Sequence, residues 1–127
     1  MKRSSMFEEK KISILGTEYT IKYIDPAEDE EMTKNNWAGI CSEALPVIRI
    51  CDLRKHPDWT NEPPGAAESM MKETLRHEIT HAFFNESGLK ASSNIFEGAW
   101  SKNEELIDWI AIQGPKMVTA WEEAGCL

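Results

Sequence analysis

The sequence predicts a single α+β domain covering residues 1–127, in which a small, mainly antiparallel sheet packs against two helices. Short segments with alternating or β-branched apolar residues occupy the first 51 residues, and apolar residues at helical spacing follow them. With 127 residues, 41% of them hydrophobic and 28% charged, the chain is long enough to bury one core without disulfide bonds.

Two strand pairs are expected in the N-terminal half. Residues 11–24 have the pattern of a hairpin, because Ile and Tyr alternate with polar residues on both sides of Gly16-Thr17, a two-residue turn with glycine first. A second pair is predicted from the short apolar segment 37–41 and from residues 47–51, which are rich in β-branched side chains. The acidic residues 28–31 between the pairs are expected to form a solvated loop or a short helix.

A helix is predicted over residues 66–87, after a proline-containing loop, with Gly88 placed to end it. Its apolar stripe consists of Met71, Leu75, Ile79, Ala82 and Phe83. A linker is expected next, and then a last helix beginning near Ser101, where Ser101 and Glu104 match a capping box. The predicted buried face of that helix comprises Leu106, Ile110, Met117 and Trp121, and Gly114-Pro115 is expected to kink or split it.

Charge and composition exclude several classes of protein. The formal charge of −8 argues against a nucleic-acid partner, and no apolar run has the length of a membrane span. The N-terminus has basic residues but no apolar stretch behind them, so a signal peptide is not expected. Cys41, Cys51 and Cys126 are interpreted as reduced thiols of a cytoplasmic protein, although a bridge between Cys41 and Cys51 across a hairpin stays open.

The residues with the clearest chemistry lie within the predicted helix 66–87. His77 and His81 are four positions apart, so both imidazoles can face one metal ion from the same side of the helix. Zn²⁺ accepts neutral imidazole nitrogens, and a site with three protein ligands leaves a fourth position for water. Glu78 is adjacent to His77 and could take a proton from that water. The pattern therefore predicts a zinc site with Glu78 as general base.

A third ligand is required, and the last helix offers it. Glu104 is the preferred candidate and Glu105 the alternative, while Asp108, four residues after Glu104, would accept the N–H of a ligand histidine. If no metal is bound, Glu104 would only cap the helix and Glu105 would only face solvent. His56 precedes a proline in a loop and is expected to be a surface residue rather than a ligand.

Together, His77-Glu78-Ile79-Thr80-His81 and the segment from Asn103-Glu104 to Asp108 resemble the gluzincin pattern, in which an Asn-Glu-x-x-x-Asp segment supplies the glutamate ligand and its supporting aspartate. The size of the chain and the run His81 to Leu89 look more like small phage and bacterial zinc peptidase-like proteins of the ImmA/IrrE type. This resemblance implies a minimal zincin-like fold and a metallopeptidase domain. The larger relatives place a Tyr or His after the ligands, and neither residue type follows His81 here, which would leave Lys102, Asn94 or the metal to stabilise the oxyanion.

Three functions fit these residues. The first is zinc-dependent hydrolysis of a protein or peptide, in a phage association that the resemblance implies, with the substrate added as a strand along residues 37–42. The second is a non-catalytic binding or assembly module that uses the same triad as a structural zinc site. The third is a metal-free domain in which the histidines serve the core.

Overall fold

The computed structural model describes residues 6–92 and 103–127, except for the side chains of Ser92 and Ile107. Its single four-stranded sheet has the order β1-β2-β4-β3. The strands are β1 (Lys10–Ile14), β2 (Thr17–Ile24), β3 (Gly39–Cys41) and β4 (Val47–Cys51). Pairs β1–β2 and β3–β4 are antiparallel, while β2 and β4 are parallel. The short strand β3 is therefore an edge of the sheet.

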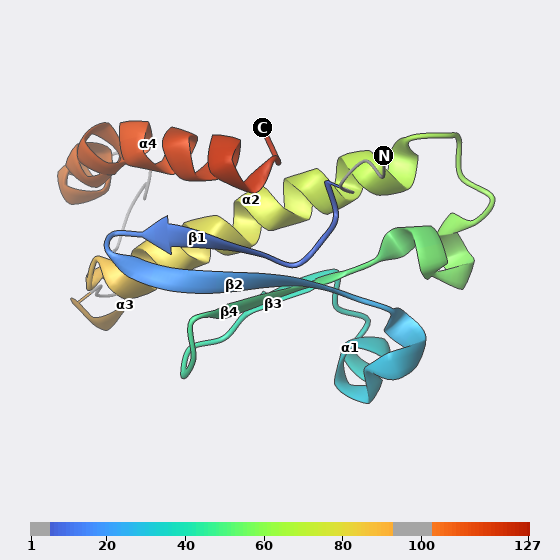
Figure 1. Ribbon diagram of the computed structural model, residues 1–127. Helices are drawn as coiled ribbons and strands as arrows, with labels where there is room; N and C mark the ends of the chain where they lie inside the picture. The colour runs from blue at the N-terminus through green and yellow to red at the C-terminus, as the bar shows by residue number, and fades with distance from the viewer. Residues whose placement is uncertain (1–5, 93–102) are drawn as a thin grey trace.

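Helices cover one face of this sheet. In Figure 1, α2 and α4 lie on one side of the sheet and α1 lies on the other, near the end of β2. Helix α2 contacts β3 and β4, and α4 contacts β1 and α2. The helices are α1 (Glu30–Asn35), α2 (Ala66–Glu86), α3 (Leu89–Ser92) and α4 (Glu104–Ala124), with 3-10 turns at Pro26–Glu28, Leu53–Lys55 and Pro57–Trp59. This confirms the expected α+β class.

The hydrophobic core lies between the sheet and α2. The predicted apolar stripe of α2 is confirmed, because all five of its residues are buried. From the sheet they meet the fully buried side chains Ile14, Ile21, Ile48 and Ile50. Each such side chain contributes about 1.5–3 kcal/mol by leaving water. Helix α2 ends at the predicted place, where Gly88 has a φ of 79°, a conformation that glycine adopts without strain.

Several expectations about the strands need correction. The hairpin turn is Leu15-Gly16 rather than Gly16-Thr17, because Ile14 pairs with Thr17 and both Leu15 and Gly16 have positive φ. The parallel pairing of β2 with β4 was not expected. The chain runs from β2 to β4 through α1 and β3. Helix α1 begins in the acidic stretch, where a short helix was one of the two expectations, and Asp29 caps it by accepting a hydrogen bond from the Met32 N–H at 2.9 Å.

The last helix also differs from expectation. Asn103, not Ser101, caps α4 by accepting a hydrogen bond from the Leu106 N–H at 3.0 Å, and Ser101 lies outside the described residues. Pro115 does not split α4, which is one helix. Ile110 is 54% exposed, whereas Met117, Ala120 and Ala124 form the buried part of the helix. The short helix α3 falls in the expected linker.

All three cysteines are free thiols. Cys41 is half-buried in β3, and Cys51 and Cys126 are buried, which agrees with the prediction of reduced cysteines and leaves no bridge between Cys41 and Cys51. Within residues 6–92 and 103–127, no helix combines the length and the hydropathy needed to cross a lipid bilayer.

Candidate metal centre

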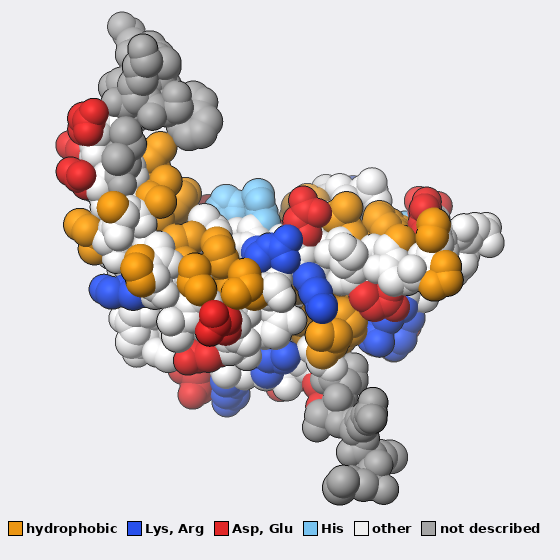
Figure 2. Space-filling view, turned by 90° about the horizontal axis from the view of Figure 1, so that it is seen from above, with side chains coloured by type: hydrophobic (Ala, Val, Ile, Leu, Met, Phe, Trp, Pro, Cys, Tyr) orange, Lys and Arg blue, Asp and Glu red, His pale blue; other side chains and the backbone are white. Residues whose placement is uncertain are grey.

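Helix α2 brings the two predicted histidines together at the protein surface. His77 Nε2 and His81 Nε2 are 3.2 Å apart, and the two rings meet edge to face with centroids 4.8 Å apart. Both side chains are exposed, and histidine side chains are visible at the surface in the view of Figure 2. Spacing of four residues on a regular helix is sufficient to produce this arrangement.

The donor geometry fits a tetrahedral metal ion. Zinc–nitrogen bonds of about 2.0–2.1 Å at a tetrahedral angle place two nitrogens about 3.3 Å apart, close to the 3.2 Å between the histidine Nε2 atoms. The ligand atoms of His77, Glu78 and His81 all lie within 4.8 Å of one another. In the absence of an ion, the same distance allows one neutral imidazole to donate a hydrogen bond to the other.

Glu78 differs from its neighbours because it is buried, with only 7% of its surface exposed. Burial raises the pKa of the Glu78 carboxyl, and the nearby His77 and His81, together with a hydrogen bond from the Cys41 N–H, act in the opposite direction. The Cys41 N–H belongs to β3, so the edge strand fixes the position of this carboxylate. Glu78 is thus held beside the histidine pair in a poorly hydrated position.

A cavity of about 1140 Å³ opens over the three residues. Its walls come from the edge strand β3 and the turn after it, from α2 and α3, and from the first turn of α4. Lys90 of α3 forms an ion pair with Glu43 of the β3–β4 turn, and both line the cavity. Burial and the Glu78 carboxylate raise the pKa of the Cys41 thiol, also in the wall, to about 11. Cys41 is therefore a neutral thiol at pH 7.

Helix α4 presents Glu105 rather than Glu104 to the cavity. Glu105 lines it with Asn103 and Leu106, whereas Glu104 is exposed and does not contribute to its wall. Glu105 also stays outside the cluster formed by the histidines and Glu78 among the described residues. Asp108 is exposed and, in the described part of the chain, makes no hydrogen bond to either histidine.

One aromatic side chain fixes this end of α4 to α2. The Trp109 Nε1–H donates to Ser87 Oγ at 3.1 Å, and the Trp109 ring packs edge to face on Phe84 with centroids 4.8 Å apart. Phe84 follows His81 by one turn of α2 and lines the cavity. Trp109 therefore sets the distance between the first turn of α4 and the histidine pair.

Other predicted residues lie elsewhere. His56 lies between two 3-10 turns, where its Nδ1 accepts a hydrogen bond from the Asp58 N–H at 3.1 Å, and it lines a separate cavity with Pro57. Lys102 and Asn94 fall outside the described residues. The cavity-lining residues Asn85, Lys90 and Glu31 were not anticipated, because no local motif marks them and only the fold brings them together.

Comparison of the chain with protein-family models, with curated proteins and with solved structures found no match in any of the three.

Proposed function

We propose that this protein is a zinc-dependent peptidase in which His77 and His81 hold the metal and Glu78 is the general base. The observation that supports it most is the 3.2 Å separation of two imidazole nitrogens beside a buried carboxylate at the floor of an open cavity. Helical spacing alone brings the imidazoles together, and the buried carboxylate beside them adds the base that hydrolysis requires.

The third ligand is proposed to come from the first turn of α4. Glu105 is favoured because it lines the cavity, and Glu104, which the sequence motif favours, is the alternative. Zinc bound here would lower the pKa of water towards about 7 and polarise a peptide carbonyl. Glu105→Gln is expected to weaken zinc binding at least tenfold, and Glu104→Gln to leave it within about twofold. The reverse order, measured by chelator competition, would assign Glu104.

Glu78 can move the proton that peptide hydrolysis requires. Its carboxylate is oriented by the Cys41 N–H and faces the same cavity as the histidines. There it would accept a proton from the attacking water and later donate it to the leaving amine nitrogen.

The open edge of β3 provides a place for the peptide. Ser42 N donates to Val47 O and Cys51 N donates to Ala38 O, so positions 38, 40 and 42 direct their backbone groups to β4. By alternation, Gly39 and Cys41 direct theirs to the free edge, along the cavity. The Cys41 N–H there donates to Glu78, so the Gly39 groups and the Cys41 carbonyl would face the peptide. An extended peptide could add there as a further strand.

The decisive experiment is Glu78→Gln. The variant should bind zinc with unchanged stoichiometry and melt near the wild-type temperature, while hydrolysis of a quenched fluorescent peptide library falls at least a hundredfold. Glu73→Gln, on the same helix, serves as a control and should keep full activity. A wild-type protein that binds zinc but cleaves no peptide would refute the proposal and favour a structural zinc module.

A further inference from the structure

The cavity continues around the edge of β3 to the opposite face of the sheet. A Cβ at Gly39 would lie 2.7 Å from Thr74 Cγ2 on α2, so position 39 faces α2. Side chains alternate along a strand, and Ile40 therefore points to the other face. Arg49 is its partner in register and shares that face. Because Ile40 and Arg49 line the same cavity as the histidines, the cavity reaches both faces.

The far end of the cavity carries an exposed carboxylate, Glu31. Arg49 binds two carboxylates, with Nη1 2.8 Å from Asp29 Oδ2 and Nη2 3.1 Å from Glu31 Oε1. The two carboxylates share one guanidinium, and its shorter contact is with Asp29, so Arg49 offsets the charge of Glu31 only in part. The Asp29 side chain is only 14% exposed and also caps α1, whereas the Glu31 side chain is 56% exposed and lines the cavity. Glu31 is therefore the carboxylate of this pair that a ligand in the cavity can reach.

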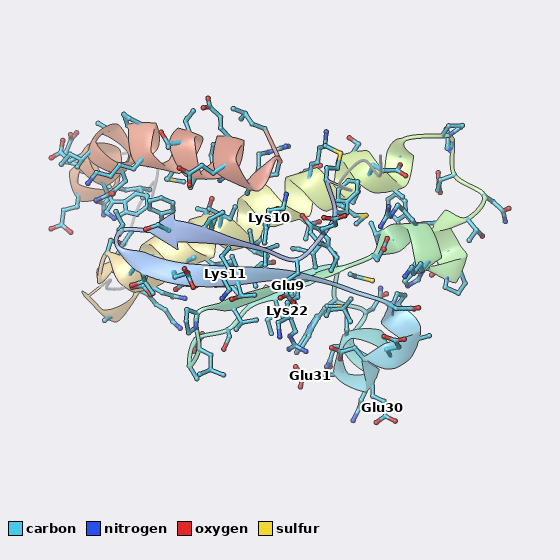
Figure 3. The ribbon with its side chains drawn as sticks, viewed as in Figure 1. Glu9, Lys10, Lys11, Lys22, Glu30 and Glu31 are labelled. Carbon is cyan, nitrogen blue, oxygen red and sulfur yellow. The ribbon has the colours of Figure 1, made fainter. Side chains whose placement is uncertain are left out.

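The position of Glu31 can be followed in Figure 3, where it lies at α1, on the side of the sheet away from α2. Trp37, at the start of the edge segment, also lines the cavity and offers an aromatic surface to a cation. Lys22, the other basic side chain near Arg49 in register, lies on β2, one strand further from the edge, and does not line the cavity.

The charge of the whole cavity has the same sign. Among the described residues, four acidic side chains line it against two basic ones. The carboxylates are Glu31, Glu43, Glu78 and Glu105, and the cations are Arg49 and Lys90. A metal at the histidine pair would offset the charge on the α2 side only. The Glu31 carboxylate lies on the other side of the sheet, away from such a metal (Figure 3).

We propose that the segment bound along β3 is an extended peptide with a lysine or arginine at a position that points away from α2, where Glu31 binds the cation. The proposal rests on the proposed function in one respect, that a peptide occupies the cavity. Alternation of side chains then places one residue towards the histidines and the next towards Glu31. A basic side chain would meet both the exposed Glu31 carboxylate and the Trp37 ring.

Binding of defined peptides to metal-free wild-type protein tests this without hydrolysis. Two capped eight-residue peptides are compared: one alternates alanine with lysine, and the other alternates alanine with glutamate. Each is titrated into the protein while the NMR signals of the protein's backbone amides are followed. The lysine peptide should bind about tenfold more tightly than the glutamate peptide, with the largest shifts at the Gly39 and Cys41 amides.

Glu31→Gln and Glu30→Gln form a matched pair. Both glutamates lie in the first turn of α1 and both changes alter the net charge equally, but Glu30 lines the separate cavity near Pro57. The preference for the lysine peptide should fall to about threefold or less in Glu31→Gln and stay at about tenfold in Glu30→Gln. Equal losses in the two variants, shifts away from β3, or no binding of either peptide would overturn the proposal.

These outcomes are separate from those of the peptidase test. The zinc-loaded protein could cleave nothing while its metal-free form prefers the lysine peptide through Glu31. That result would refute the peptidase and support the proposed peptide-binding site. Cleavage of peptides without any dependence on Glu31 would support the peptidase and refute the binding of a basic side chain by Glu31.

Discussion

Gly39 is the point at which the edge strand comes closest to the helix that carries the histidines. An added Cβ would lie 2.7 Å from Thr74 Cγ2, 3.1 Å from Ile50 Cδ1 and 3.3 Å from the Arg49 carbonyl oxygen. Ordinary van der Waals contact begins near 3.4 Å. Thr74 is β-branched and buried on a helix, so its methyl group has little freedom to move. Gly39→Ala must therefore push β3 away from α2.

The expected cost follows from overpacking in a buried contact, about 2 kcal/mol of unfolding free energy. For a chain of this length, that loss corresponds to a decrease in melting temperature of about 7 °C. Thr74→Ser removes the clashing methyl group, at a cost of about 1 kcal/mol by itself. In the double variant the second change should relieve the first, with a coupling of at least about 1 kcal/mol.

Urea denaturation of the wild type, the two single variants and the double variant measures this coupling. Hydrolysis should fall more in Gly39→Ala than the population of folded protein explains, because displacement of β3 withdraws the Cys41 N–H from Glu78. Thr74→Ser should restore part of that activity. A cost below about 0.5 kcal/mol for Gly39→Ala, or strictly additive changes, would show that β3 and α2 do not meet in this way.

Two further predictions concern other parts of the molecule. Trp109→Phe removes the donor to Ser87 and should lower zinc affinity about threefold in a chelator competition. Trp121→Phe should leave the affinity unchanged, because the buried Trp121 Nε1–H has no hydrogen-bond partner among the described residues. Equal effects of the two changes would exclude a positioning role for Trp109. Hydrogen bonds from Arg54 hold the pKa of the Asp52 carboxyl below its usual value. Because the folded pKa is the lower one, this stabilisation is complete above about pH 4 and is lost as the pH falls below it. Asp52→Asn should therefore lower the unfolding free energy at pH 6 by about 1–3 kcal/mol. The difference in unfolding free energy between the variant and the wild type should shrink by about pH 2.5. A difference independent of pH would contradict stabilisation by the ionised Asp52 carboxylate.

Local sequence patterns predicted those features that depend on local geometry. The stripe of α2 and the meeting of His77 with His81 require only a regular helix, because residues four apart share a face. The strands at 10–14, 17–24 and 47–51 follow from alternation and β-branching in the same way. The turn was misplaced by one residue because Leu15 adopts a left-handed conformation that its side chain does not favour.

Local sequence patterns do not predict the order of the strands in the sheet. It depends on the segment that carries the chain from β2 back to β4, with α1 on one face of the sheet. The short helix, one of the two expectations for the acidic stretch, is present, and Asp29 followed by two glutamates is its local signal. That signal predicts the helix but not the pairing of β4 with β2. Because β4 pairs with β2, β3 is left at the edge beside α2, and the cavity over Glu78 follows from that placement.

The choice between Glu104 and Glu105 shows the same limit within one helix. Neighbouring residues on a helix are separated by about 100°, so either carboxylate could face the histidines, depending on how α4 is rotated. Spacing groups Glu104 with Asp108 and Glu105 with Trp109, but it does not set the rotation. That is set by the contact of Trp109 with α2, which places Glu105 on the side facing the cavity and leaves Glu104 and Asp108 exposed. If zinc binding proves to depend on Glu104, α4 must turn by about one residue when the metal binds, and the Trp109–Ser87 hydrogen bond would be the first contact to break.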